Sequence, residues 1–256
     1  MYALAAFYQR LVDLPAAQSA CELVGLPRLI PYWPGMIAFA LLFQVLRLSS
    51  NTLSSLVFGA KFDTLAPRKK YDWGVRVVSQ VHAIAVVLLA IPIFFKEELI
   101  KDTLYGFDDY ASRVYTVICL GFVVHALASF SVYILAFRPS LQYYGASFIM
   151  FEASTIFLNN NWWLDKLGMT GSKLQWYNAI TLLFLYLTVR IMFGTYMSYH
   201  MFEDLKARGY QTSAPLYYFY RIANGSIILL SYYWFYLLIV GAMKRFSSPK
   251  PSKKTE

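Results

Sequence analysis

Long apolar runs recur along this chain of 256 residues and limit the folds that it can adopt. A helix needs about 20 apolar residues to cross the hydrocarbon core of a bilayer, and a soluble core could not bury so many runs of that length. Composition agrees, because 58% of the residues are hydrophobic and 14% are charged, whereas soluble domains carry about 25% charged residues. The sequence therefore predicts an all-α fold, a polytopic bundle of transmembrane helices.

The apolar runs predict about six membrane segments, within a range of five to seven, around a lipid-accessible cavity. Their approximate bounds are 34–58, 73–95, 113–137, 140–158, 175–200 and 217–243. Residues 1–30 are predicted to be an N-terminal interfacial segment with an amphipathic helix near 3–16. The transmembrane domain is expected to cover residues 31–243, and a basic cytosolic tail follows at 244–256.

Positive charge is concentrated in two parts of the sequence, whose net charge is +9. Loop 61–70 holds one cluster and the tail holds the other, and neither shows the aromatic–basic interleaving of a nucleic-acid site. The positive-inside rule places both clusters in the cytosol. Six complete crossings would put them on opposite sides, so either one segment does not cross fully or a crossing is missing from the count. Residues 140–158 are the candidate for a re-entrant segment.

Ionisable side chains inside the apolar runs are the main candidates for a functional site, because a charged group at bilayer depth is costly. His125 lies near the middle of the third run, and Ser129 follows four residues later. At neutral pH a histidine can serve as a general base or as a nucleophile. The alternative is a histidine that only packs and hydrogen-bonds inside the bundle.

The second run carries Arg76, Ser79 and His82, and their spacing of three residues places them on one broad helical face. His82 is expected either to assist His125 in catalysis or to pack between helices. Both roles need a position inside the bundle, whereas Arg76 is close enough to the basic loop to extend its charge to the interface.

A second polar face is predicted on the fourth run, which carries Glu152, Thr155 and Asn159 at helical spacing. Arg190, midway along the fifth run, is the expected ion-pair partner of Glu152. A pair that only fixes helix register is the alternative. The predicted substrate-binding side chains are together Arg76, Ser79, Ser129, Glu152, Thr155, Asn159, Tyr186 and Arg190.

The sequence offers little for a metal centre, since it has two cysteines and three histidines. Neither cysteine falls in a metal-ligand spacing, and the pair makes no disulfide framework. We therefore expect no metal and no cofactor, and any chemistry would come from the protein's own side chains.

The chain ends in Lys253-Lys254-Thr255-Glu256. Lysines at the third and fourth positions from the carboxyl end resemble the dilysine retrieval signal of endoplasmic-reticulum membrane proteins. Such a signal requires a cytosolic C-terminus, which agrees with the charge rule. A chance pair of lysines in a basic tail is the alternative.

These segments together resemble the TLC domain family, which includes the ceramide synthases and a group of small TLC domain-containing proteins. The resemblance covers about residues 35–243 and rests on Trp73-x-x-Arg76-x-x-Ser79-x-x-His82-Ala83, His125, Glu152-x-Ser154-Thr155-x-Phe157-Leu158-Asn159-x-x-Trp162 and Arg190. The string from Glu152 to Trp162 is the most specific part, and it is similar to the small members rather than to the ceramide synthases.

One departure from the ceramide synthases bears on activity. Those enzymes carry two adjacent histidines and a later aspartate motif, whereas this chain reads Val124-His125-Ala126 and has no matching aspartate-rich string. If acyl transfer needs both histidines, this chain is not an ordinary ceramide synthase, although His125 alone or with His82 would still allow acyl chemistry.

The resemblance implies a protein of lipid homeostasis in the endoplasmic-reticulum membrane, which binds or regulates acyl lipids in a transmembrane cavity. A lipid acyltransferase that uses His125 with His82 is the first alternative, with an acyl-CoA or acyl lipid and a sphingoid or phospholipid acceptor as substrates. A trafficking or assembly partner held by Lys253 and Lys254 is the second. The expected partners are membrane lipids and not nucleic acid, and the sequence leaves the oligomeric state open.

Overall fold

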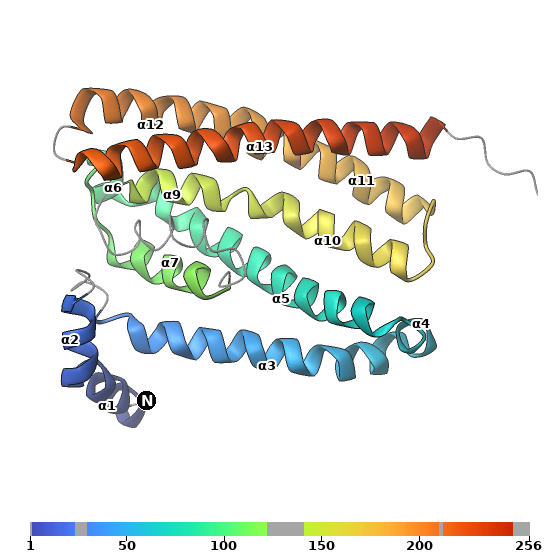
Figure 1. Cartoon of the computed structure of the whole chain (residues 1–256), viewed down its shortest axis with the longest axis horizontal. Coiled ribbons are helices and arrows are strands. Elements are labelled where there is room, and N and C mark those ends of the chain that lie inside the picture. The colour runs from blue at the N-terminus through green and yellow to red at the C-terminus, as the bar shows by residue number, and fades with distance from the viewer. Residues whose placement is uncertain (1, 24–29, 122–140, 210–211, 248–256) are drawn as a thin grey trace, which may run out of the picture.

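The computed structural model describes residues 2–23, 30–121, 141–209 and 212–247. Every regular element in these ranges is a helix (Figure 1), which confirms the all-α prediction. Four helices are long and apolar enough to cross a membrane, and they are Trp33–Phe58, Pro67–Phe95, Lys173–Arg208 and Ala214–Lys244. The chain therefore has the architecture of a polytopic helical membrane protein.

The first two long helices form an antiparallel hairpin. Helix α3 (Trp33–Phe58) has a proline in its first turn and ends at Gly59, whose φ of 51° favours glycine. The short helix α4 (Ala60–Asp63) makes the turn, and α5 (Pro67–Ala90) returns along α3. Helix α5 then tightens into the 3₁₀ helix η2 (Ile91–Phe95), where Pro92 cannot donate a hydrogen bond.

The next part of the chain starts and ends at the same end of the bundle. Helices α6 (Glu97–Lys101) and α7 (Asp109–Gly121) follow η2, and α9 (Gln142–Ile149) begins beside them (Figure 1). Two contacts fix this return, because the Leu141 amide donates to the Leu104 carbonyl at 2.6 Å and the Asp108 amide donates to the Gln142 side chain at 2.9 Å. The start of α7 and the start of α9 therefore lie at the same end, and residues 122–140 of the segment predicted at 113–137 lie outside the described residues.

Helices α9 and α10 (Glu152–Lys166) instead run one after the other from this end to the opposite end (Figure 1). The expectation of a re-entrant segment at 140–158 is thus wrong, because α9 and α10 together run the length of the bundle (Figure 1). Loop 167–172 then leads into a continuous 36-residue helix, which comprises α11 (Lys173–Leu185), the π-helix η3 (Tyr186–Phe193) and α12 (Gly194–Arg208).

The last helix, α13 (Ala214–Ser247), runs back beside this long helix to the end that holds α4 (Figure 1). The turn around α4 and the end of α13 therefore lie at the same end of the bundle (Figure 1). The two basic clusters of the sequence flank these two places. The conflict between charge and crossing number in the six-crossing scheme is thereby removed.

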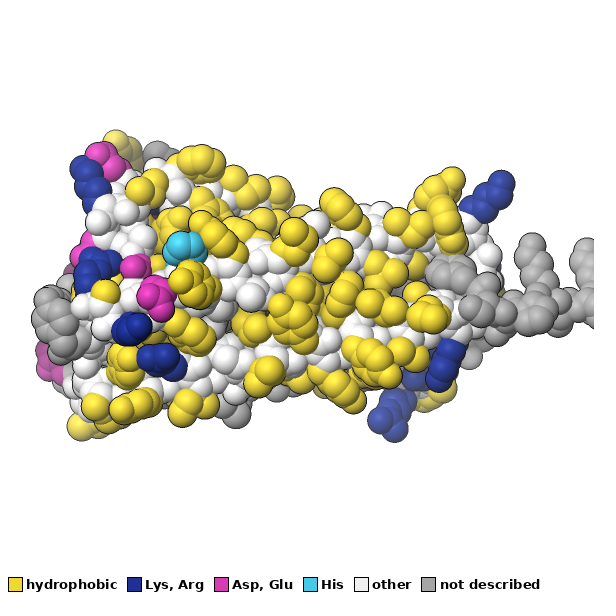
Figure 2. Space-filling view, turned by 90° about the horizontal axis from the view of Figure 1, so that it is seen from above, with side chains coloured by type: hydrophobic (Ala, Val, Ile, Leu, Met, Phe, Trp, Pro, Cys, Tyr) yellow, Lys and Arg dark blue, Asp and Glu magenta, His cyan; other side chains and the backbone are white. Residues whose placement is uncertain are grey.

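The two ends differ in charge. The end that holds α4, called here the basic end, carries Lys61, Arg68, Lys69, Lys70, Lys166, Lys173 and Lys244 against Asp63, Asp72 and Asp165. The other end, called here the acidic end, carries Glu97, Glu98, Asp102, Asp108, Asp109, Glu203 and Asp204 against Lys96, Lys101, Arg113, Lys206 and Arg208. On the face seen in Figure 2, acidic side chains gather at the acidic end only, and apolar side chains cover the length between.

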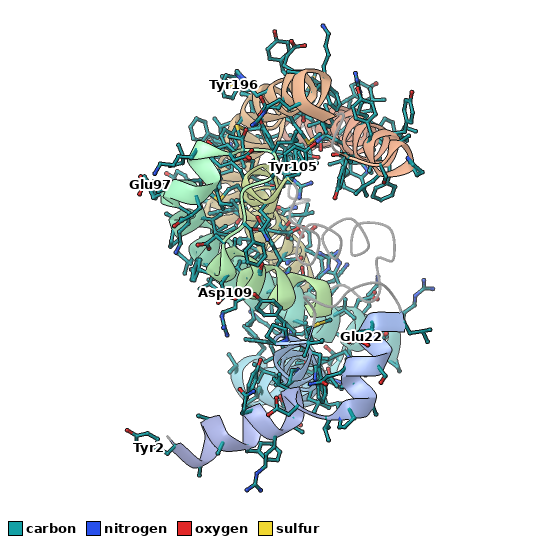
Figure 3. The ribbon with its side chains drawn as sticks, turned by 90° about the vertical axis from the view of Figure 1, so that its left-hand side faces the viewer. Tyr2, Glu22, Glu97, Tyr105, Asp109 and Tyr196 are labelled. Carbon is teal, nitrogen blue, oxygen red and sulfur yellow. The ribbon has the colours of Figure 1, made fainter. Side chains whose placement is uncertain are left out.

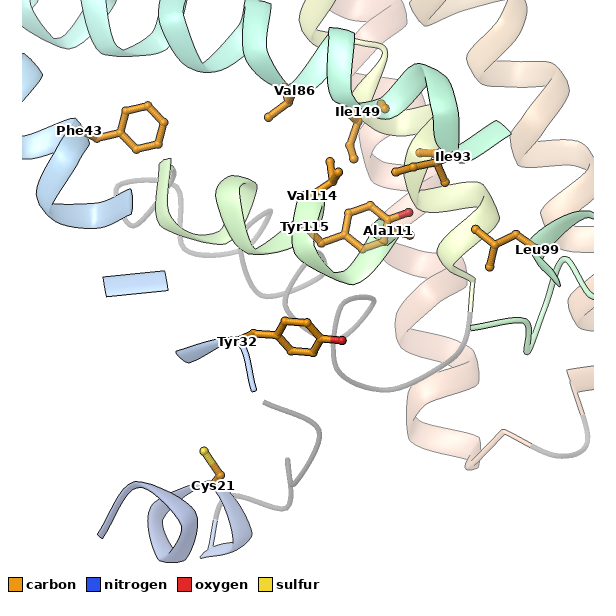
Figure 4. Close-up of a cluster of buried hydrophobic side chains, with 12 residues drawn as sticks. Cys21, Tyr32, Phe43, Val86, Ile93, Leu99, Ala111, Val114, Tyr115 and Ile149 are labelled. Atoms are coloured by element: carbon orange, nitrogen blue, oxygen red, sulfur yellow. The ribbon is translucent and has the colours of Figure 1, made fainter. Parts of the chain in front are cut away.

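Two apolar clusters hold the described helices together at the acidic half. One lies between α3, α5, α7 and α9 and contains Val86, Ile93 and Tyr115 (Figure 4). The other joins α9 to α12 and α13 and contains Tyr144 and Met201. Elsewhere, large apolar side chains point outward, as in Leu56 at 78% exposure and Leu229 at 72%, which is expected of a surface that faces lipid.

The N-terminal helices α1 (Tyr2–Val12) and α2 (Pro15–Leu23) lie to one side of the bundle, next to the start of α3 (Figure 3). The break between them comes at Pro15, so the amphipathic helix expected at 3–16 is shorter than predicted. The Tyr8 hydroxyl donates to the Pro31 carbonyl at 2.7 Å and ties α1 to the start of α3. The interfacial role of this segment stays a prediction.

Candidate functional site

Helix α10 is central to the candidate site because it packs against α5 on one side and against α11 and η3 on another. Its polar side chains therefore meet two neighbours inside the bundle. The sequence pattern predicted one polar face on this helix, and the structure divides that face between two contacts.

On the α5 side, three predicted residues come together. The Arg76 guanidinium donates to the Asn159 amide oxygen at 2.9 Å, and the Asn159 amide nitrogen donates to the Ser79 hydroxyl at 3.2 Å. The Arg76 charge also lies over the Trp162 ring, at 4.7 Å from its centre. Since Asn159 is 3% exposed, this is an interior cluster that joins α5 to α10.

His82 lies one turn further along α5 from Ser79. Its side chain is 1% exposed, and its ring meets the Phe43 ring edge-on with centres 5.9 Å apart. The structure thus places His82 between α3 and α5 in an aromatic environment. Its predicted partner His125 lies outside the described residues, as does Ser129.

On the other side of α10, Arg190 reaches across from η3. Its Nε donates to the Ser154 hydroxyl at 2.8 Å and to the Phe151 carbonyl at 3.2 Å, and its Nη2 donates to the Thr155 hydroxyl at 3.2 Å. The guanidinium carbon lies 5.1 Å from the centre of the Tyr186 ring. Three predicted residues, Thr155, Tyr186 and Arg190, are therefore in contact.

The predicted ion pair between Glu152 and Arg190 is not among the ion pairs of the described residues. The break between α9 and α10 explains the difference. It presents the Phe151 carbonyl to the guanidinium, and the first turn of α10 adds the hydroxyls of Ser154 and Thr155. A continuous helix would have offered Arg190 no such carbonyl.

The backbone around Arg190 is unusual. Residues 186–193 form a π-helix, and π-type segments occur often at functional sites. Gly194 follows directly, and a Cβ at that position would lie 2.5 Å from the Phe151 ring. This close approach holds Phe151 beside the long helix and under the Arg190 guanidinium, at 5.4 Å from the ring centre.

Two cavities lie nearer the basic end, and the predicted site residues line neither of them. The larger is a groove of 590 Å³ between α11 and α13. Polar residues of loop 167–172 and the start of α11 form its mouth, and four leucines line its inner part, namely Leu182, Leu183, Leu237 and Leu238. The smaller cavity, of 340 Å³, lies beside Trp73, Trp163 and Asn178.

The groove and the Arg190 cluster are neighbours along the same helix. Leu182 precedes Tyr186 by one turn, and the Tyr186 ring stacks on Phe235 of α13 with centres 5.8 Å apart. This stack separates the inner part of the groove from Arg190. Sequence reasoning missed the groove because its lining comes from helices more than fifty residues apart, and none of its leucines differs in pattern from lipid-facing ones.

The sequence reasoning also missed an interior contact near the smaller cavity. The Trp73 indole donates to the Ser54 hydroxyl at 2.8 Å, and the Trp73 ring is 2% exposed. A serine within an apolar run was the available signal. In the part of the chain that the structure describes, no group of three or more His, Cys, Asp or Glu side chains could hold a metal ion.

The fold and its interior guanidinium groups define a polytopic helical membrane protein with polar clusters inside the bundle. A family model described as the TLC domain matches residues 110–240, and the chain belongs to this family. It is 27% identical to an uncharacterized TLC domain-containing protein of Schizosaccharomyces pombe, over 91% of this chain and 86% of that protein.

Two further relatives extend this comparison. Topoisomerase I damage affected protein 4 of Saccharomyces cerevisiae is 26% identical over 86% of this chain and 88% of its own length. TLC domain-containing protein 4 of Homo sapiens is 29% identical over 51% of this chain and 58% of its own length. No solved structure is significantly similar to this chain.

Proposed function

We propose that this protein binds an acyl lipid in the groove between α11 and α13 and serves lipid homeostasis as a binding or regulatory protein. The groove carries the proposal. Its 590 Å³ lies in the range of small-molecule sites, its mouth is polar and includes Lys173, and its inner wall is made of leucines. This order of polar and apolar surface matches a lipid whose headgroup stays at the membrane surface.

The energetics of such binding differ from those in water. Acyl chains in a bilayer are already in an apolar environment, so burial alone favours the groove little. Affinity and selectivity must come from packing against the leucines and from hydrogen bonds at the mouth. Lys173 is the side chain at the mouth that would make them, whereas Thr170 and Gln175 already donate hydrogen bonds to Asp165. Of the predicted substrate-binding residues, Arg76, Ser79, Thr155, Asn159, Tyr186 and Arg190 would support the helices that form this groove.

The proposed location is the endoplasmic-reticulum membrane, with the basic end in the cytosol. The charge difference between the two ends supports this orientation under the positive-inside rule. It also directs the chain after α13 toward the cytosol, where Lys253 and Lys254 would be read as a retrieval signal.

A test of the groove uses paired tryptophan substitutions on α11. Ala179→Trp fills the groove, whereas Ile180→Trp adds the same ring on a side chain that is 43% exposed. Native mass spectrometry of the purified proteins measures the lipid that remains bound. We expect Ala179→Trp to lose one bound acyl lipid that wild type and Ile180→Trp retain. Equal lipid in all three forms would exclude the groove.

The acyltransferase and trafficking alternatives make different predictions in cells that lack the protein. If an enzyme acts through His125, a His125→Ala form that accumulates normally will not restore the lipid profile. If trafficking alone matters, a form with both Lys253 and Lys254 replaced by Ser will fail to rescue these cells, whereas forms with substituted histidines will rescue them. The binding proposal expects His125→Gln to restore the profile.

A further inference from the structure

Arg190 is placed where a charge is hard to accommodate. It lies near the midpoint of the 36-residue helix Lys173–Arg208, roughly 26 Å from either end at the usual helical rise. Exposed aromatic residues on the same helix mark the two interfaces, with Trp176 on one side and Tyr199 on the other. Arg190 lies between these marks, and its guanidinium points at α10 rather than at either interface.

No carboxylate neutralises this charge among the described residues. Its closest hydrogen bonds go to one backbone carbonyl and two hydroxyls, and its other contacts are with the Phe151 ring and with the ring and hydroxyl of Tyr186. Most other carboxylate partners are excluded by the sequence, because residues 24–29, 122–140 and 210–211, which lie outside the described ranges, contain no Asp or Glu. Charged side chains at this depth pair with one another or with backbone carbonyls, and they mark substrate pathways.

The geometry of the guanidinium shows where such an anion would bind. A guanidinium has N–H groups on Nε, Nη1 and Nη2. Nε is occupied by Phe151 and Ser154, and one bond from Nη2 goes to Thr155. The edge formed by Nη1 and Nη2 thus keeps donors in parallel, which is the arrangement that binds two oxygens of one oxyanion.

We propose that Arg190 binds the terminal oxyanion of an anionic lipid inside the bundle, with Ser154 and Thr155 holding the guanidinium in place. The ligand chemistry is two coplanar oxygens on an acyl amphiphile, as in the carboxylate of a fatty acid or the phosphomonoester of phosphatidic acid. Neutral esters of the same acyl chains lack this pair of charged oxygens. This site is separate from the groove and goes beyond the proposed function, and the π-helix together with Gly194 sets the position of the cation.

The experiment measures saturable binding of labelled oleate to the full-length protein in phosphatidylcholine nanodiscs. Arg190→Gln removes the cation, and Arg190→Lys keeps a charge without the bidentate edge. Arg47→Gln is the matched control, because Arg47 is an arginine on another candidate span. We expect Arg190→Gln to weaken oleate binding by about tenfold or more, Arg190→Lys to weaken it less, and Arg47→Gln to leave it unchanged.

Displacement of oleate from the wild type by other lipids identifies the oxyanion. This measurement does not depend on whether the Arg190 variants fold. Excess phosphatidic acid should displace oleate from the wild type if a phosphomonoester also fits, and failure to displace would restrict the site to carboxylates. Methyl oleate should not displace it. Equal displacement by methyl oleate, or equal oleate binding by wild type and Arg190→Gln, would overturn the proposal. Ala179→Trp should keep Arg190-dependent oleate binding, so the groove and this site can fail separately.

Discussion

At the scale of single residues, Gly194 is the clearest constraint on the site. A Cβ there would meet the Phe151 ring at 2.5 Å, so Gly194→Ala must push Phe151 or the long helix away. We expect a loss of about 1–3 kcal/mol in stability, together with weaker contact between Arg190 and the Phe151 carbonyl. Thermal unfolding in detergent measures the loss.

Gly225 on α13 is the control for this substitution, because a Cβ there meets nothing within 4 Å. Gly225→Ala should stabilise the helix by about 0.5–1 kcal/mol. If both substitutions changed stability alike, the close approach at Gly194 would not be a real constraint.

Single residues also show how far the sequence could predict the site. The faces of α5 and α10 followed from helical spacing, and the structure joins Arg76, Ser79 and Asn159 as that spacing implied. The partner of Arg190 could not be predicted from the sequence, because charge complementarity favoured Glu152. The helix break before α10 exposes the Phe151 carbonyl to Arg190 instead, and no residue in that stretch predicts the break.

At the scale of elements, the acidic end is tied together by side chains from different helices. Arg208 of α12 donates to Asp102 at 3.0 Å, and Asp204 accepts hydrogen bonds from Thr103 and Tyr144, each at 2.5 Å. The turn after α6 is thereby fastened to α9 and α12. These hydrogen bonds connect elements that the sequence pattern could not relate, since their partners are up to 106 residues apart.

This network predicts a dependence of stability on pH. Partial burial raises the pKa of Asp102, but hydrogen bonds from the backbone of Tyr105 and Leu104 and from Arg208 outweigh it, so the pKa lies below its ordinary 3.8. A lowered pKa contributes stability that is present above the unfolded-state value and lost as pH falls through the folded-state value. The unfolding temperature should therefore drop on acidification below about pH 4.

Two variants test whether Asp102 causes this drop in unfolding temperature. Asp102→Asn should lower stability at neutral pH and flatten the acid dependence, whereas Asp63→Asn at the basic end should keep the full dependence. Identical pH profiles for Asp102→Asn and wild type would show that the Asp102 contacts do not couple to protonation.

At the scale of the whole molecule, the topology is testable by cysteine labelling in sealed microsomal vesicles. In a background with Cys21 and Cys119 changed to Ser, we expect Thr64→Cys and Thr170→Cys to react together with an impermeant maleimide. Glu98→Cys and Ser213→Cys should react only after the membrane is opened, since they lie at the acidic end. Labelling of Thr64→Cys and Thr170→Cys from opposite sides would contradict the fold.

The arrangement of the helices in the whole molecule also shows what could not be predicted from the sequence. Composition and apolar runs gave the fold class and nearly every segment, because hydropathy depends on local sequence alone. The position of α9 beside α6 (Figure 1) depends on contacts such as that between Leu141 and Leu104, and these form only when the chain is folded. The groove has the same origin, since α11 and α13 form it jointly.

The measurement that tests the central claim most directly is photo-crosslinking of a fatty acid with a diazirine near the end of its chain, followed by peptide mapping. Binding in the groove predicts adducts on residues 179–183 of α11 and 237–242 of α13, and their loss in Ala179→Trp but not in Ile180→Trp. Adducts spread evenly over the lipid-facing sides of α3 and α13, unchanged by Ala179→Trp, would mean that the acyl chain only touches the outside of the protein.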